Sequence, residues 1–158
     1  MAADLTPRER AERSAEAMWA GDQASAWIGM TIESIDEGMA ELALTVQPHH
    51  TNGHGICHGG ITFTLADSAF AFACNSRNLS TVAQHNVVSF LKPVKSGTRL
   101  LARAEEVSLS GRSGIYDVRV TDHSGQVVAE MRGFSRAIGG HLFDEAAFED
   151  APEKGKGT

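Results

Sequence analysis

The stretch that decides the fold is Ile61–Cys74, which reads ITFTLADSAFAFAC. It is longer than a usual strand, and its many small residues suit a helix. Because nearly every position is apolar, this helix has no face for water and is expected at the centre of the fold. Asp67 is the one charged residue within it.

The segments around this helix have the pattern of strands, with apolar residues at every second position and turn residues between them. Consecutive strands with short turns imply an antiparallel sheet, and a helix inserted once implies an α+β fold. One long sheet wrapped around one helix leaves edges that favour pairing with a second subunit. The expected strands are Ile28–Ile35, Met39–Gln47, Val82–Leu91, Thr98–Leu109, 116–121 and Gln126–Ile138.

The two ends of the chain differ in character. Thr6 and Glu9 have the spacing of a capping box, and helix formers follow, so an N-terminal helix is expected within 1–25. The tail, 141–158, ends in a Gly-, Glu- and Lys-rich run and is expected to be partly disordered. With no repeat and no internal boundary, residues 1–158 are predicted to form one domain.

Composition excludes several classes of protein. The 158 residues are 42% hydrophobic and 22% charged, which is typical of a globular protein. The net charge of −6 argues against binding to nucleic acid. No apolar stretch is long enough to cross a membrane, and the N-terminus lacks a signal-peptide pattern, so a cytoplasmic location is expected. Cys57 and Cys74 are expected to be free thiols.

The loop that precedes the central helix, 49–60, contains four of the seven histidines and four glycines. Gly59 and Gly60 stand where this loop enters the helix. The first amides of a helix lack internal partners and carry the positive end of the helix dipole. They can therefore bind an anion, or an oxygen that becomes negative during a reaction.

Asp67 admits two interpretations. Burying an unpaired carboxylate is costly, so the side chain either has an Arg partner from the sheet or serves as a base or nucleophile. A zinc site is a further alternative for the region, but the spacing of its candidate ligands matches no standard zinc pattern. Those candidate ligands are His54, Cys57, His58 and Cys74.

The run 52–71, NGHGICHGGITFTLADSAFA, closely resembles the hotdog-fold acyl-CoA thioesterases. The continuation through 75–78, NSRN, is most similar to their PaaI group, named for phenylacetic acid degradation. The resemblance implies a hotdog fold and homodimers assembled into a homotetramer, with active sites between subunits. It also implies an acyl-CoA substrate, with no metal and no cofactor beyond the coenzyme A that the substrate carries.

The resemblance also implies roles for individual residues. Asp67 matches the catalytic carboxylate, acting as nucleophile or general base. Gly59 matches the residue whose backbone amide polarises the thioester carbonyl. Asn52 matches a polar residue that positions water or substrate, and His58 matches the histidine that aligns the thioester.

Four more residues are expected to contact substrate: Gly60, Ser68, Gln84 and His85. One departure from the family pattern lies at Ala83, directly before two of these residues. Some relatives carry a partner-subunit hydroxyl near the position of Ala83, which has none, so Gln84 or His85 would have to replace it.

The expected reaction is hydrolysis of an arylacetyl-CoA, such as phenylacetyl-CoA or a ring-modified relative, to the free acid and CoA. Two alternatives remain. The first is a hotdog-fold dehydratase or hydratase, in which His58 and Asp67 would move a proton and water across a double bond. The second is an acyl-CoA-binding sensor without catalysis, which would have no need of Asp67.

Overall fold

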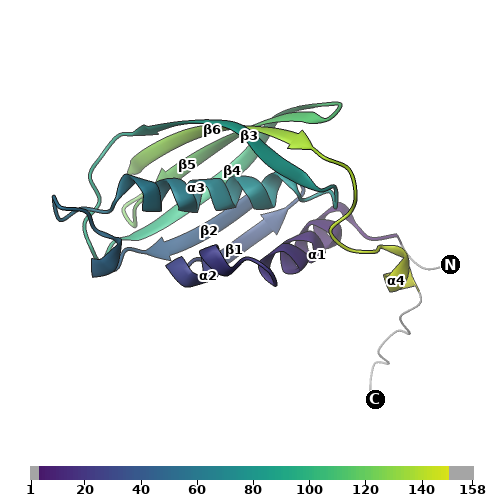
Figure 1. Ribbon diagram of the computed structural model, residues 1–158, viewed down its shortest axis with the longest axis horizontal. Helices are drawn as coiled ribbons and strands as arrows, with labels where there is room; N and C mark the ends of the chain where they lie inside the picture. The colour runs from purple at the N-terminus through teal and green to yellow at the C-terminus, as the bar shows by residue number, and fades with distance from the viewer. Residues whose placement is uncertain (1–3, 150–158) are drawn as a thin grey trace, which may run out of the picture.

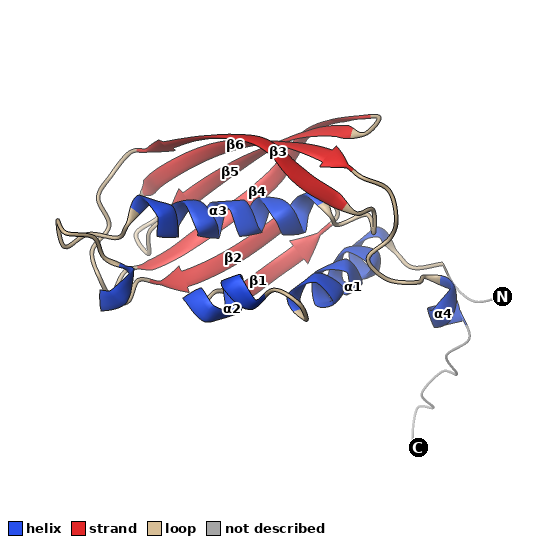
Figure 2. Ribbon diagram, viewed as in Figure 1, coloured by secondary structure: helices blue, strands red, loops and turns tan. Residues whose placement is uncertain are grey.

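A curved antiparallel sheet wraps around the central helix α3 (Gly59–Cys74) in this computed structural model, which describes residues 4–149 (Figures 1 and 2). Its strands lie in the order β1-β2-β4-β5-β6-β3, and each neighbouring pair is antiparallel. The predicted α+β architecture is therefore confirmed. The strands are β1 (Thr31–Asp36), β2 (Met39–Thr45), β3 (Thr81–Phe90), β4 (Arg99–Ser110), β5 (Ser113–Thr121) and β6 (Val127–Ala137).

The core lies between α3 and the concave face of the sheet. Leu65, Ala69 and Phe70 on the helix have no exposed surface. The Phe70 ring packs on the ring of Tyr116 in β5, with their centroids 5.5 Å apart. Burial of such large apolar side chains stabilises the fold by roughly 1.5–3 kcal/mol each.

The Phe70 ring of α3 packs directly against the backbone of Gly133 in β6. A Cβ atom built on this glycine would lie 2.9 Å from three ring atoms of Phe70. Gly133 pairs with Tyr116 on one side and with Asn86 on the other, so it lies between strands β5 and β3. Because Gly133 has no side chain, the Phe70 ring of α3 can occupy the space that a Cβ atom would take.

Strand β3 follows α3 along the chain but pairs only with β6, so it forms one edge of the sheet. The other edge, β1, packs against the N-terminal helix α1 (Pro7–Trp19). On β3 and just after it, four large apolar side chains are 46–54% exposed. They are Val82, Val87, Phe90 and Leu91.

The N-terminal region contains two helices where one was expected. The capping box at the start of α1 is confirmed. The strand predicted for Ile28–Ile35 is present as β1, but its predicted start is wrong, because Ile28 ends a second helix, α2 (Gln23–Ile28). Asp22 caps α2 by accepting a hydrogen bond from the Ser25 amide at 2.9 Å. Gly29, with φ of +97°, ends the helix in the left-handed conformation that glycine adopts without strain, and β1 begins two residues later.

The first part of the tail 141–158 is held in place. It contains a short helix, α4 (Ala146–Glu149). Glu145 pairs with Arg10 of α1 at 2.8 Å and accepts a hydrogen bond from Asn78 at 3.2 Å. The predicted disorder concerns the end of the tail, which lies outside the described residues.

We expect Gly133→Ala to lower the free energy of unfolding by about 1–3 kcal/mol, because the new methyl group overpacks the Phe70 ring. Urea denaturation followed by circular dichroism measures this change. Gly21→Ala is the matched control, since a Cβ there has no heavy atom within 4 Å. Equal stability of the two variants would contradict the packing argument.

Candidate active site

The N-terminus of α3 presents one free backbone donor. His58 is the N-cap residue, and its Nδ1 accepts a hydrogen bond from the Gly60 amide at 2.8 Å. The next amides along, those of Ile61 and Thr62, donate to the His58 carbonyl. Within residues 4–149, the Gly59 amide has no hydrogen-bond partner. Gly59 is therefore the donor available to a ligand, whereas the Gly60 amide is used by the cap.

The capping role also sets the tautomer of His58. Its Nδ1 can accept a hydrogen bond only in the unprotonated state, so the ring is neutral and carries its hydrogen on Nε2. The side chain is exposed. His58 thus orients the start of α3 and leaves Nε2–H free to donate.

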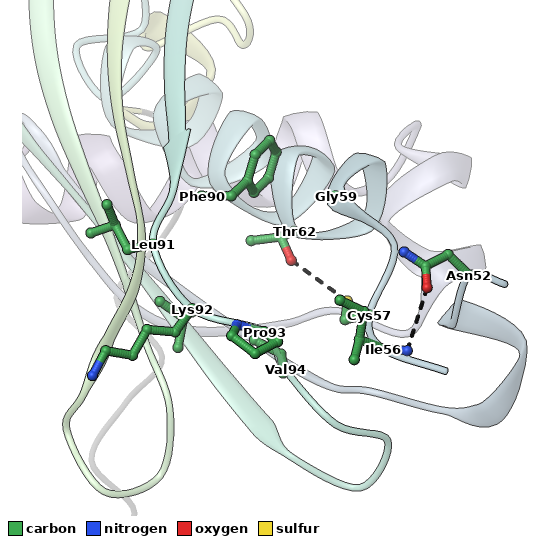
Figure 3. Close-up of a pocket in the computed structure, with 11 residues that line it drawn as sticks. Asn52, Ile56, Cys57, Gly59, Thr62, Phe90, Leu91, Lys92, Pro93 and Val94 are labelled. Atoms are coloured by element: carbon green, nitrogen blue, oxygen red, sulfur yellow. Dashed lines mark hydrogen bonds between the residues drawn. The ribbon is translucent and has the colours of Figure 1, made fainter. Parts of the chain in front are cut away.

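Asn52 is fixed by the turn that it closes. Its Oδ1 accepts hydrogen bonds from the amides of His54, at 3.0 Å, and Ile56, at 3.4 Å. Gly55, with φ of +73°, makes this turn possible. Because Oδ1 is occupied, the side-chain NH2 group is left to donate, and Figure 3 shows Asn52 beside the start of α3.

A cavity of about 350 Å³ opens at this point (Figure 3). The Phe90 ring lies over the helix start, since a Cβ on Gly59 would be 3.1 Å from its Cζ. Most of the cavity wall is apolar, whereas Asn52, Thr62, Lys92 and the backbone of Gly59 supply polar groups. The lining residues are Asn52, Ile56, Cys57, Gly59, Thr62, Phe90, Leu91, Lys92, Pro93, Val94 and Val128.

Asp67 is half-buried in the middle of α3. Its Oδ1 accepts a hydrogen bond from Asn86 Nδ2 of β3 at 2.8 Å. No Arg in the described part of the chain pairs with it, so the predicted structural alternative is wrong. Burial raises the pKa of Asp67, and the hydrogen bond from Asn86 opposes that rise. Burial and the Asp67 charge also raise the pKa of Cys74 to about 12.

Asp67 and the Gly59 amide are not neighbours within one chain. They are separated by eight positions of α3, which at the rise of an α-helix is about 12 Å. Asp67 does not line the cavity at the helix start. One copy of the chain therefore cannot present both groups to the same carbonyl.

The other predicted contact residues lie apart from the cavity. The Ser68 hydroxyl is 2.8 Å from that of Ser25, so it joins α3 to α2. Gln84 and His85 are exposed on the edge strand β3, where Gln84 is the extra residue of a bulge. The His85 ring contacts that of Phe134, with centroids 5.4 Å apart. Their contact with substrate stays a prediction.

Sequence reasoning missed Asn86 and Phe90. Both lie on β3, and both face α3, as their contacts with Asp67 and Gly59 show. Alternation along the strand is the signal that places them on the same face. The bulge at Gln84 shifts that alternation, so the sequence alone did not reveal which residues face the helix.

The part of the chain that the structure covers contains neither a cluster of metal-ligating side chains nor a helix that could cross a membrane. Between residues 4 and 149, no three His, Cys, Asp or Glu side chains are grouped so that they could hold a metal ion. The zinc alternative therefore has no support. No helix in the same range is long and apolar enough to cross a membrane.

The enclosed helix, the wrapped sheet and the free amide at the helix start define the hotdog-fold class of thioester-binding proteins. A family model described as "Thioesterase superfamily" matches residues 54–129. The acyl-coenzyme A thioesterase PaaI of Escherichia coli (strain K12) is 40% identical over 137 residues, which cover 87% of this chain and 98% of that protein. The chain therefore belongs to the thioesterase superfamily.

Solved structures agree with this assignment. The E. coli PaaI protein from the phenylacetic acid degradation operon matches with a TM-score of 0.85 and 39% identity, covering 86% of this chain and 99% of that one. A Streptococcus mutans protein bound to acetyl-CoA matches with a TM-score of 0.69 and 26% identity, covering 72% and 91%. The predicted resemblance and the hotdog fold are thus confirmed.

The raised pKa of Asp67 predicts a stability change with a definite sign. A carboxyl whose pKa is higher in the folded than in the unfolded state disfavours folding once pH rises through the folded value. We expect Asp67→Asn to have a larger free energy of unfolding than the parent at pH 7. This difference should disappear below about pH 4, where the carboxyl is protonated in both states.

Denaturant unfolding at several pH values measures this difference. Asp117→Asn is the matched control with the opposite sign, because the Arg132 guanidinium lowers the pKa of Asp117. That variant should be less stable than the parent at pH 7, and the loss should shrink as pH falls. A destabilised Asp67→Asn protein at pH 7 would contradict the assignment of Asp67 as a desolvated carboxylate.

Proposed function

We propose that this protein is an acyl-CoA thioesterase that hydrolyses arylacetyl-CoA esters. The observation that carries the proposal is the free Gly59 amide at the start of α3, the helix whose middle carries the half-buried carboxylate of Asp67. In the reaction, water adds its oxygen to the acyl carbon, the carbon–sulfur bond breaks, and the CoA thiolate takes up a proton. The products are the free acid and CoA.

The Gly59 amide donates to the thioester oxygen as negative charge develops there. A donor of this kind contributes about 10²–10³ in rate. The Asn52 NH2 group, beside the same cavity, positions the thioester or the attacking water. The neutral His58 ring orients the helix start and donates from Nε2.

Asp67 acts on the carbonyl carbon, either as the nucleophile or as the base that deprotonates water. Burial makes it a stronger base than an exposed aspartate. An aspartate nucleophile needs no neighbouring base, which suits a site without a Ser-His pair. Because Asp67 is about 12 Å along α3 from Gly59, the two groups that meet one substrate come from different subunits.

The edge strand β3 supports a homodimer as the functional unit, and we propose that two such homodimers form a homotetramer. Val82, Val87 and Phe90 expose about half of their surface on this edge. The unpaired strand backbone and these apolar side chains favour pairing with another β3. Pairing across β3 places α3 of each subunit, and with it Asp67, near the interface.

The mostly apolar cavity beside Gly59 suits an aromatic acyl group or the pantetheine arm of CoA. The operon of the similar E. coli protein points to phenylacetyl-CoA and its hydroxylated or ring-modified relatives. We propose that the reaction requires no cofactor and no metal, and that the protein is cytoplasmic. Cys57 and Cys74 are both free, which is typical of a reducing compartment.

Asp67→Asn is expected to bind acyl-CoA and to lose most turnover, because the amide is neither base nor nucleophile. The assay follows release of CoA thiol with a disulfide reagent across arylacetyl and aliphatic acyl-CoAs. Asp67→Ala in the same assay separates loss of the carboxylate from loss of the Asn86 contact. Near-full hydrolysis by Asp67→Asn would overturn the assignment of Asp67.

The same assay separates the alternatives. A dehydratase or hydratase would change enoyl absorbance without releasing thiol, and a sensor would bind acyl-CoA with no product at all. Either result for the parent protein would overturn the proposed function.

Gly59→Pro is expected to lower kcat by about 10²–10³ relative to Gly59→Ala, because proline lacks the amide donor. Proline is tolerated at the first position of a helix, and His58 already has φ of −60° and ψ of 133°, which a following proline accepts. Gly59→Ala is the matched control, since it keeps the amide and places a similar Cβ against Phe90. Equal rates for the two variants would exclude the amide as the oxyanion donor.

Mixing the two inactive variants tests the shared site. If Gly59 and Asp67 of one site come from different subunits, a mixed dimer of Gly59→Pro and Asp67→Asn chains has one intact site. Random exchange of equal amounts should then recover about a quarter of the parent activity. No recovery in mixed dimers would contradict a site built from two subunits.

A further inference from the structure

Among the described residues, Asn86 alone donates a hydrogen bond to the Asp67 carboxylate. It lies in the middle of β3, opposite Gly133 of β6, and its side chain reaches α3. Its Nδ2 donates to Asp67 Oδ1 at 2.8 Å. Its Oδ1 is buried and has no hydrogen-bond partner among the described residues.

A buried acceptor without a partner costs stability, and an apolar side chain of similar shape would avoid that cost. A purely structural role therefore does not explain why an asparagine stands at this position of a strand that faces an apolar helix. Because Oδ1 makes no other bond, the orientation of the amide is set by Asp67 alone. The residue is an isolated partner of the carboxylate and belongs to no wider network.

The hydrogen bond has two consequences for Asp67. It occupies Oδ1 and holds the carboxylate in one orientation, so Oδ2 is the oxygen left to react. It also favours the charged form, which burial disfavours. Without this donor, burial would act unopposed and the pKa of Asp67 would be higher still.

Within its own chain, among residues 4–149, Asp67 has no other hydrogen-bond or ion-pair partner that could take over this role. Burial and Asn86 are the two influences on its pKa. On its own helix, the titratable neighbour is Cys74, whose pKa of about 12 keeps it neutral. Neither β3 nor another strand brings a charged side chain into an ion pair with Asp67 within residues 4–149.

We propose that Asn86 is the positioning residue of Asp67: its amide holds the carboxylate in one orientation, with Oδ2 free to react. For catalysis, this inference rests on the proposed thioesterase function. The hydrogen-bonded pair itself does not depend on that function, so it can be tested without turnover.

The test replaces Asn86 by Leu, which is similar in size and has no donor. Carboxyl-carbon NMR of labelled protein follows the titration of Asp67 directly. Because the donor lowers the pKa, its removal should raise the pKa of Asp67 above the parent value. The acid limb of the kcat/KM profile should move to higher pH, and kcat should fall by roughly tenfold to a hundredfold with KM little changed.

Two further variants make the test decisive. Asn86→Gln keeps a donor and should restore part of both the titration and the rate, and Asn86→Ala replaces Asn86→Leu if leucine prevents folding. Val88→Ala, on the same face of β3, is the control for weakened strand packing and should leave the titration of Asp67 at the parent value.

An unchanged titration of Asp67 in Asn86→Leu would overturn the inference, whatever happens to the rate. If the parent protein proved to hydrolyse no acyl-CoA, the proposed function would fail instead, and a shifted titration would still establish the pair. A lower rate with an unshifted titration would show that Asn86 acts only through strand structure, which also contradicts the proposal.

Discussion

The constraint on which this structure depends is that α3 carries large apolar side chains that must be buried against the sheet. A helix with Leu65, Ala69 and Phe70 completely buried must be enclosed, and a single sheet can enclose it only by curving around it. That curvature requires close contact between helix and sheet, which Gly133 permits opposite Phe70. Strand β3, which follows α3 along the chain, lies at the edge of the sheet opposite β1, where it pairs with β6.

The same helix carries both Gly59 and Asp67, and the direction of its dipole and its length decide where each of them lies. Its positive end supplies the free Gly59 amide, because His58 caps the neighbouring amide of Gly60. Its middle carries Asp67, where burial raises the pKa of the carboxylate. The two groups to which we assign catalytic roles therefore lie on one helix, about 12 Å apart along its axis, which is too far for both to act on one carbonyl within one chain.

Much of this was readable from the sequence because it depends on local pattern. The apolar run 61–74 predicted the enclosed helix, and the capping box at Thr6 predicted where α1 begins. The helix α2 was missed because it ends at Gly29, which adopts the left-handed conformation. The apolar residues on either side of Gly29 have a strand-like pattern, so the sequence did not indicate that a helix ends there. Asn86 was missed for a related reason: a bulge in β3 changes which residues face inward, and only the paired strands reveal it.

The exposed edge of β3 has a consequence for how the protein would behave on dilution. If chemistry requires residues from two chains that meet along this edge, specific activity becomes a measure of association. Activity per chain would then fall with decreasing protein concentration, as dimers dissociate into chains that each retain the fold but hold only half of a site. The half-exposed side chains of Val82, Val87 and Phe90 would set the concentration at which this occurs.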